Sequence, residues 1–142
     1  MNLAVFEIGG CLFACPSEYV ETVIDANEAL AFDMGPKWVD GIVELAGRQI
    51  LVIDISKILK IDSNNTKSLM VIDINGDQIC LKADEFVGYM DVPGNTTAKS
   101  ISGDIGTLSG VLVGMFKLDH KKYHLLNLAQ LSNTPIYTGS HI

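Results

Sequence analysis

The stretch GIVELAGRQILVIDISKIL, residues 41–59, decides the fold. Apolar residues dominate Ile42–Leu45 and again Ile50–Ile55, and Ala46-Gly47-Arg48-Gln49 separates the two runs. Short runs rich in β-branched residues on either side of a glycine-containing turn are typical of a β-hairpin. A short helix over Lys57–Lys60 follows, and Ser56 can cap it because a side-chain oxygen there accepts an otherwise unpaired backbone N–H.

The rest of the chain is also rich in strand patterns. Strands are predicted over Leu3–Ile8, Cys11–Cys15, Ser68–Ile74, Gln78–Ala83, Val111–Leu118 and Tyr123–Leu126. Asn75-Gly76 is the strongest hairpin signal, because both central positions of a type I′ turn need a positive φ. We expect a short helix after Ser17 that carries Val20 and Val23, loops over residues 25–40 and 91–110, and an irregular stretch over residues 84–92. These elements predict an all-β fold with short capping helices.

The two halves of the sequence resemble each other. Three pairs of segments match in pattern at a nearly constant spacing along the chain: Val5–Gly10 with Val71–Gly76, Ser17–Val20 with Ala83–Phe86, and Val52–Ile58 with Leu125–Leu131. Such self-similarity indicates a duplicated β-unit of about five strands. We expect one domain over residues 1–133, with one lobe over about residues 1–62 and a second over about 67–133. Residues 62–66 form the linker, and residues 134–142 are predicted to be a mobile tail.

The composition excludes several classes of function. Of 142 residues, 48% are hydrophobic and 19% charged, which is typical of one globular domain. The formal net charge is −7 and the single arginine is Arg48, so we expect neither nucleic acid nor an anionic membrane surface as a partner. The start has no basic, apolar leader, and no run approaches the ~20 apolar residues that span a bilayer. Cys11, Cys15 and Cys80 lie in apolar contexts, which predicts reduced thiols in a cytoplasmic protein.

Candidate reactive groups do not converge on a catalytic site. His120 and His124 fall in the turn and the returning strand of one predicted hairpin, and no nearby cysteine or glutamate completes a zinc site. Cys11 and Cys15 share one strand face, and we expect both to face the core. Asp54 follows a strand, but the long helices of a receiver domain are absent, so we interpret it as a helix cap. We therefore predict no enzyme, metal or cofactor, and a β-scaffold that binds a peptide or partner domain.

The order of motifs resembles the CheW-type chemotaxis coupling protein family from Leu3 to about Leu131. The family signature G-V-x-N-L-R-G-x-I-x-P-V-x-D-L is similar to Gly41–Ile55, with departures at Glu44, Ala46 and Leu51. Seven further segments fit the family pattern in the same order: Phe6–Gly10, Phe13–Pro16, Val20–Val23, Pro36–Gly41, Lys82–Phe86, Gly110–Val111 and Leu125–Leu128.

This resemblance implies two five-stranded SH3-like or OB-like β-barrels packed together, without catalytic activity. It implies an adaptor that couples a methyl-accepting chemotaxis receptor, or a similar sensor, to a CheA-type histidine kinase in chemotaxis or pilus-linked motility. The residues it implies at a groove and partner surface are Val20, Val23, Gly41, Ile42, Glu44, Leu45, Ala46, Gly47 and Arg48. At Gly41 the absence of a side chain would permit a close backbone approach.

The departures from the signature leave other hypotheses open. Ala46 lacks the bidentate donor that the family's arginine supplies at the partner-contacting turn, and Glu44 changes the charge beside it. A divergent CheW-like module that localises or regulates a different partner through the same groove is therefore the alternative function. A small enzyme that uses His120, His124 and the cysteines is the third hypothesis, and it has the least support.

Overall fold

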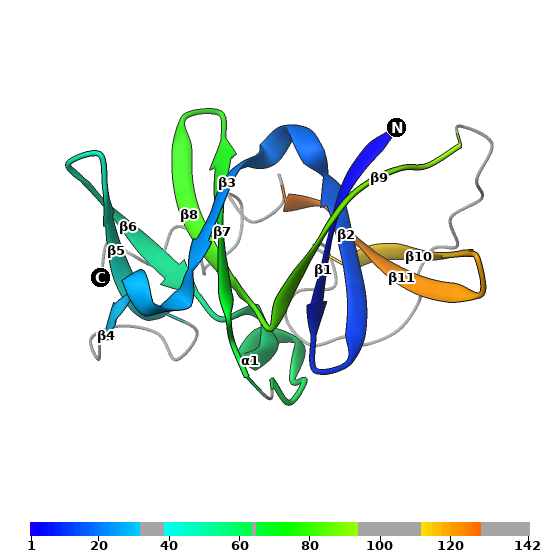
Figure 1. Ribbon diagram of the computed structural model, residues 1–142, viewed down its shortest axis with the longest axis horizontal. Helices are drawn as coiled ribbons and strands as arrows, with labels where there is room; N and C mark the ends of the chain where they lie inside the picture. The colour runs from blue at the N-terminus through cyan, green and yellow to red at the C-terminus, as the bar shows by residue number, and fades with distance from the viewer. Residues whose placement is uncertain (32–38, 64, 94–111, 129–142) are drawn as a thin grey trace.

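Strands make up most of the computed structural model, which describes residues 1–31, 39–63, 65–93 and 112–128 (Figure 1). The strands are β1 (Asn2–Ile8), β2 (Cys11–Pro16), β3 (Val20–Asp25), β4 (Leu30–Ala31), β5 (Val39–Leu45), β6 (Arg48–Ile53), β7 (Ser68–Ile74), β8 (Asp77–Ala83), β9 (Glu85–Asp91), β10 (Leu112–Leu118) and β11 (Lys121–Leu126). The helical segments are two 3₁₀ turns, η1 (Ser17–Tyr19) and η2 (Ala26–Glu28), and one α-helix, α1 (Ile55–Leu59). The predicted all-β fold with short helices is confirmed.

The strands form two sheets, and each sheet takes strands from both halves of the sequence. One sheet has the order β10-β11-β2-β1-β9, and the other has the order β3-β7-β8-β6-β5-β4. We call the second sheet, which is built from residues 20–83, the middle lobe. The first sheet is built from both ends of the described chain, and we call it the terminal lobe. The expected lobes, residues 1–62 and 67–133, therefore do not coincide with the two sheets.

Each sheet contains strands of both halves because the third strand of each half crosses to the sheet of the other half. β3 leaves the β1–β2 hairpin and pairs with β7, and β9 leaves the β7–β8 hairpin and pairs with β1. At the second crossing, the Asp84 carboxylate accepts a hydrogen bond from the Gly9 backbone N–H (2.7 Å), which ties the end of β8 to the β1–β2 turn. The linker around residue 64 thus separates the two sequence repeats and does not separate the two sheets.

The internal repeat predicted from the sequence is confirmed in the strand pairing. Pairs of residues at equivalent positions of the two sequence halves face each other in both lobes: Val20–Ile72 and Phe86–Phe6, Val52–Cys80 and Leu125–Ala14, and Gly41–Val52 and Gly114–Leu125. Even the irregularities recur, because the register shifts just before Gly41 and just before Gly114. Each lobe is therefore the same arrangement of strands, assembled from opposite halves of the chain.

The hydrophobic core follows the same repeat. The terminal lobe buries Leu3, Val5, Ala14, Phe116 and Tyr123 in one cluster, and the middle lobe buries their equivalents, Leu69, Val71, Cys80, Val43 and Ile50, in another. A third cluster contains side chains of both sheets and of α1, among them Phe6, Phe13, Ile55, Ile72 and Leu81. This central cluster joins the lobes into one unit, because neither sheet could bury these side chains alone.

Several segments differ from the sequence prediction. After Ser17 there is a single 3₁₀ turn followed by β3, and not a helix that carries Val20 and Val23. The β-branched residues of this stretch favour a strand, and β7, far away in the sequence, supplies the backbone partners. The expected loop over residues 25–40 contains η2 and β4. The expected irregular stretch after Asp84 is the strand β9, whose pairing with β1 shifts register between Val5 and Phe6.

The short helix is displaced from its expected position by two residues at its start. α1 begins at Ile55, and its N-cap is Asp54, whose carboxylate accepts a hydrogen bond from the Ser56 backbone N–H (3.1 Å). The interpretation of Asp54 as a helix cap is therefore confirmed, whereas the prediction that Ser56 caps the helix is wrong. A carboxylate at this position also interacts favourably with the helix N-terminus.

Some predictions lie outside the described residues. These are most of the loop over residues 91–110 and the tail over residues 134–142. Within the described residues, no helix has both the length and the apolar character that crossing a bilayer requires.

Candidate partner-binding surfaces

Two of the predicted site residues are buried within the protein itself. Val20 at the start of β3 is only 9% exposed and belongs to the central cluster, where it pairs with Ile72. Gly41 is buried on β5. Neither residue presents a side chain to a partner, so any influence they have on binding acts through the position of their strands.

The close approach predicted at Gly41 is made by this chain's own β4. An added Cβ at Gly41 would lie 2.6 Å from the backbone carbonyl oxygen of Leu30, and Gly41 pairs with Ala31 across the two strands. Real Cβ atoms do not come this close to a backbone oxygen, so any side chain here would displace β4. The glycine thus fixes β4 on the edge of the middle lobe.

An apolar row crosses three neighbouring strands at this edge. Leu30 on β4 pairs with Ile42 on β5, which pairs with Leu51 on β6, so the three side chains share one face of the sheet. Ile42 and Leu51 are half-buried, and Leu30 is 71% exposed. We call these three residues the apolar row. Of these three residues, only Ile42 was predicted from the sequence to belong to the site.

The turn between β5 and β6 lies at the end of the same hairpin. Ala46 and Gly47 occupy its centre with φ of 52° and 78°, and both are exposed. Leu45 pairs with Arg48, and Glu44 pairs with Gln49, so Glu44 and Arg48 lie on opposite faces of the hairpin. Arg48 is the first residue of β6, two positions beyond Ala46.

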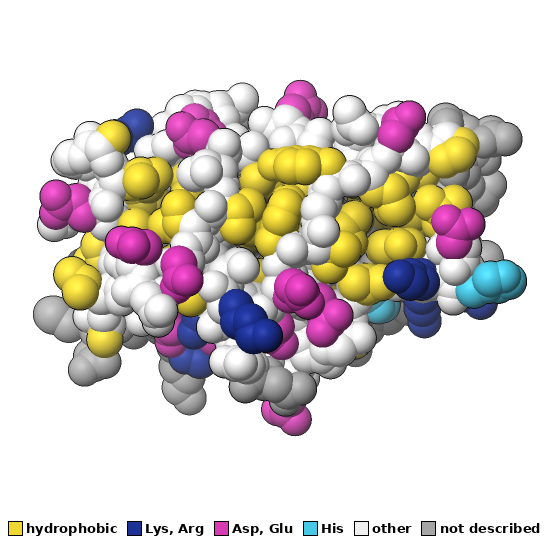
Figure 2. All heavy atoms as spheres, in the orientation of Figure 1, with side chains coloured by type: hydrophobic (Ala, Val, Ile, Leu, Met, Phe, Trp, Pro, Cys, Tyr) yellow, Lys and Arg dark blue, Asp and Glu magenta, His cyan; other side chains and the backbone are white. Residues whose placement is uncertain are grey.

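A second apolar surface is formed by β3 and β9, which are edge strands of the two sheets. Val23 on β3 and Phe86 on β9 are partly buried against the central cluster, and Tyr89 on β9 is 61% exposed. The Tyr89 ring contacts the Phe86 ring edge-on, with 5.4 Å between centroids. We call these three residues the edge-strand surface. Figure 2 shows hydrophobic side chains gathered in a band across the face of the molecule on which β3 and β9 are seen in Figure 1.

Phe86 and Tyr89 were missed as site residues by the sequence analysis. The sequence repeat nevertheless indicated both residues. Phe86 follows Val20, and Tyr89 follows Val23, at the same spacing at which Val71 follows Val5. A residue proposed for partner binding in one half therefore has its structural equivalent in the other half. The repeat relates the predicted site residues Val20 and Val23 to Phe86 and Tyr89, so both aromatic residues could have been predicted from the sequence.

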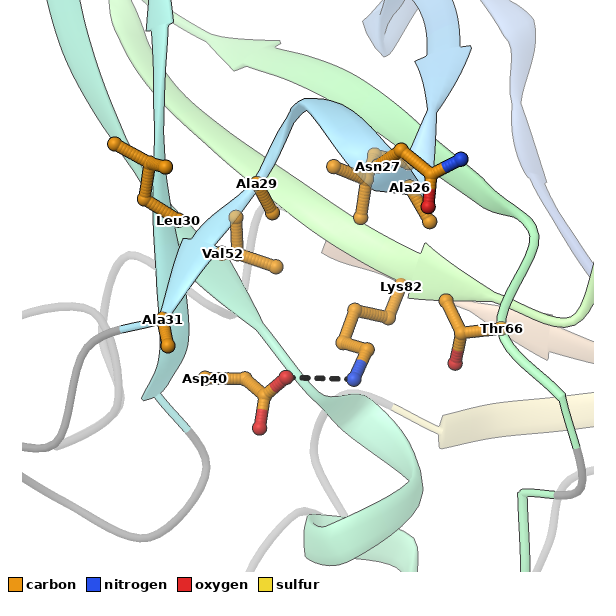
Figure 3. Close-up of a pocket in the computed structure, with 10 residues that line it drawn as sticks. Ala26, Asn27, Ala29, Leu30, Ala31, Asp40, Val52, Thr66 and Lys82 are labelled. Atoms are coloured by element: carbon orange, nitrogen blue, oxygen red, sulfur yellow. Dashed lines mark hydrogen bonds and ion pairs between the residues drawn. The ribbon is translucent and has the colours of Figure 1, made fainter.

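A pocket of about 300 Å³ lies behind β4 in the middle lobe (Figure 3). Its walls include Ala29, Val52 and Leu69, and Lys82 points across it to Asp40, with 2.6 Å between the ammonium nitrogen and the carboxylate oxygen. Lys57 of α1 donates to the other oxygen of Asp40 at 3.0 Å. The hydrogen bond from Lys82, followed by that from Lys57, holds the pKa of Asp40 below its usual value against the opposing effect of burial. Lys82 also lies 3.8 Å from the Asp54 carboxylate, so two ammonium groups balance two carboxylates and connect β5, β8 and the start of α1.

The remaining titratable groups have properties of core residues. Burial raises the pKa of Cys15 to about 12 and that of Cys80 to about 11, so neither thiol ionises near neutral pH. Cys11 packs against the same central cluster as Cys15, as the strand alternation predicted. His120 lies in the β10–β11 turn and His124 on β11, as predicted, and within the described residues no three histidine, cysteine or acidic side chains are placed to hold a metal ion.

The fold and these surfaces define a class of protein: a two-lobed β-protein with exposed apolar side chains on both lobes. The sequence model of the CheW-like domain family matches residues 2–135, so the chain belongs to this family. Its structure is similar to that of the scaffolding protein TtCheW from Thermoanaerobacter tengcongensis, with a TM-score of 0.82 and 19% sequence identity over 95% of this chain and 89% of that chain. No curated protein matches the sequence.

These comparisons confirm the family resemblance seen in the sequence. The structural match also confirms a fold of two SH3-like subdomains, and the family model makes the chain a CheW-like domain. Such a domain is non-catalytic, so the prediction that the chain is not an enzyme is confirmed.

Proposed function

We propose that this protein is a cytoplasmic adaptor that couples a chemoreceptor, or a similar sensor, to a CheA-type histidine kinase. The observation that carries the proposal is the presence of two separate apolar surfaces on one rigid scaffold: the edge-strand surface and the apolar row. A coupling protein must hold two partners at once, which requires two surfaces that do not overlap.

The edge-strand surface suits a helical partner. Tyr89 and Phe86 provide aromatic area on β9, and Val23 provides a β-branched contact on β3. Aromatic side chains that are exposed before binding and buried afterwards are the usual anchors of protein interfaces. We assign this surface to the receptor, whose cytoplasmic end in this family is a helical hairpin.

The apolar row and the adjoining β5–β6 turn suit a second β-domain. Leu30 on the short edge strand β4 is 71% exposed, and Ile42 extends the row inward. The turn residues Glu44, Leu45, Ala46, Gly47 and Arg48 extend this surface. We assign it to the regulatory domain of the kinase, with Gly41 acting through the position of β4.

One observation favours the alternative, in which a CheW-like module localises or regulates a different partner. Ala46 stands at the centre of the β5–β6 turn, and the arginine nearest to it, Arg48, is the first residue of β6 and pairs with Leu45. A typical kinase partner that expects arginine there would lose its bidentate contact. Restoring the residue with Ala46→Arg is expected to strengthen binding to a CheA-type kinase, and unchanged affinity would remove this turn from the kinase contact.

Affinity purification of the tagged chain from its native cell, followed by mass spectrometry, tests the proposal. We expect a histidine kinase and a chemoreceptor among the captured proteins. Tyr89→Glu is expected to lose the receptor and keep the kinase, and Leu30→Glu is expected to do the reverse. Both residues are exposed, so neither change places a charge in the core. Capture of neither partner by the wild-type chain would refute the coupling function.

A further inference from the structure

The hairpin formed by β10 and β11 ends in a turn with an unusual concentration of positive charge. Lys117, Lys121 and Lys122 are all exposed, and with Asp119 they give residues 117–122 a formal charge of +2 in a chain whose net charge is −7. In the equivalent segment of the middle lobe, residues 44–49, the only charged residues are Glu44 and Arg48, so the segment has no net charge. We call residues 117–122 the basic tip.

The lysines of the basic tip lie where they repel one another. Lys117 and Lys122 face each other directly across the two strands. Like charges at directly opposed positions destabilise a hairpin. Within the described residues none of the ion pairs includes either lysine. The positive charge of Lys122 reaches along β11, where it adds to the effect of burial in lowering the pKa of His124.

The turn between β10 and β11 also has a side chain at a position where three similar turns of this protein have glycine. In four two-residue turns of the described chain both central residues have positive φ, and three of them place glycine second: Gly9-Gly10, Ala46-Gly47 and Asn75-Gly76. The fourth has His120 there, with φ of 67°, after Asp119 with φ of 51°. Glycine adopts this backbone conformation without steric cost and histidine does not. Strained residues of this type concentrate at functional sites.

Both features therefore reduce the stability of the hairpin while giving it an exposed cationic end. We propose that the basic tip is a docking site for an acidic surface patch of a partner protein, in which Lys117, Lys121 and Lys122 supply the charge and His120 supplies a further contact. The tip lies at the opposite end of the molecule from the β5–β6 turn (Figure 1), so it is separate from the surface assigned to the kinase above. The site itself does not depend on the proposed function, which bears only on the identity of the partner.

An acidic protein segment or surface fits better than nucleic acid or an anionic membrane. Nucleic acid and anionic membranes bind through many phosphate or headgroup contacts at once, and they repel a chain of net charge −7 outside this small tip. A few carboxylates on a folded partner can face the tip without approaching the rest of the acidic surface. Electrostatic contacts of this type mainly raise the association rate and the specificity.

A titration with a polyglutamate peptide, followed by NMR amide shifts at low salt, tests the proposal. We expect shifts in residues 117–122 that disappear as salt is raised, and a loss of affinity of about tenfold in Lys122→Glu, because charge reversal replaces an attraction by a repulsion. Lys60→Glu, at the end of α1, is the matched control with the same net charge, and its affinity should change little. Equal losses in the two variants, or tighter binding of anionic vesicles or duplex DNA than of polyglutamate, would overturn the proposal.

Thermal unfolding of the variants separates a binding role from a structural one. Lys122→Glu places opposite charges across the strands and His120→Gly removes the strained side chain, so we expect both to raise the melting temperature while they weaken polyglutamate binding. Unchanged binding in His120→Gly would exclude His120 from the site. Because these measurements need no kinase or receptor, a failure of the coupling function would leave their outcome intact.

Discussion

Replacing Tyr89 by alanine separates partner binding from folding. Tyr89 is 61% exposed, so roughly 100 Å² of a tyrosine side chain remains to be buried by a docked helix. At about 25 cal/mol per Å² this burial contributes about 2.5 kcal/mol, and the alanine keeps a small part of it. We therefore expect Tyr89→Ala to weaken receptor binding by about 2 kcal/mol, or roughly thirtyfold. The fold should lose only the edge-on contact with Phe86, worth about 1 kcal/mol.

Isothermal titration calorimetry with the purified cytoplasmic hairpin of the receptor measures this effect. Tyr89→Phe keeps the ring and is expected to retain most of the affinity. Leu30→Ala is the matched control, because Leu30 is also highly exposed but belongs to the apolar row on the other surface. If Tyr89→Ala and Leu30→Ala weakened receptor binding equally, or if Tyr89→Ala unfolded the protein, the assignment of the edge-strand surface to the receptor would be wrong.

Three further predictions concern the scaffold. Gly41→Ala is expected to destabilise the fold by about 1–3 kcal/mol in urea unfolding, because its Cβ would lie 2.6 Å from the Leu30 carbonyl oxygen; an unchanged midpoint would contradict the role of β4. Asp40→Asn removes the 2.6 Å partner of Lys82 and is expected to cost about 1–2 kcal/mol near neutral pH. Because the pKa of Asp40 is lowered in the fold, this cost should shrink as the pH falls below 3.8, and a pH-independent difference would count against the ion pair. Burial, and then Lys122, lower the pKa of His124 in the fold, so the unfolded chain binds more protons and stability should decline as the pH falls through 6.5. His124→Phe should remove that decline, which chemical unfolding at a series of pH values can check.

The strands and hairpins could be predicted from the sequence because their signals are local. The apolar run within Ser68–Ile74 and the Asn75-Gly76 turn depend on neighbouring residues alone, and the structure has both the strand and the turn. The repeat was also readable, because equivalent residues face equivalent neighbours in the two lobes. Asp54 could be interpreted as a cap because aspartate is a preferred N-cap residue and the sequence lacks the long helices of a receiver domain.

What the sequence did not reveal depends on contacts between distant segments. Val20 and Val23 have spacing compatible with a helix or a strand, and only the pairing with β7 decides for the strand. The same exchange places Val20 in the core, where a side chain expected to contact a partner is covered by the other half of the chain. At Gly41, the sequence indicated a close backbone approach but not that β4 makes it, since β4 is only two residues long.

The most direct test of the coupling function is reconstitution of the chain with the CheA-type kinase and the receptor hairpin from the same cell. Sedimentation velocity of the three purified components measures whether one complex contains all of them. We expect a ternary species that sediments faster than either binary complex, and its loss in both Tyr89→Ala and Leu30→Ala. Competition between kinase and receptor for the chain, so that only binary complexes form, would contradict the existence of two separate docking surfaces.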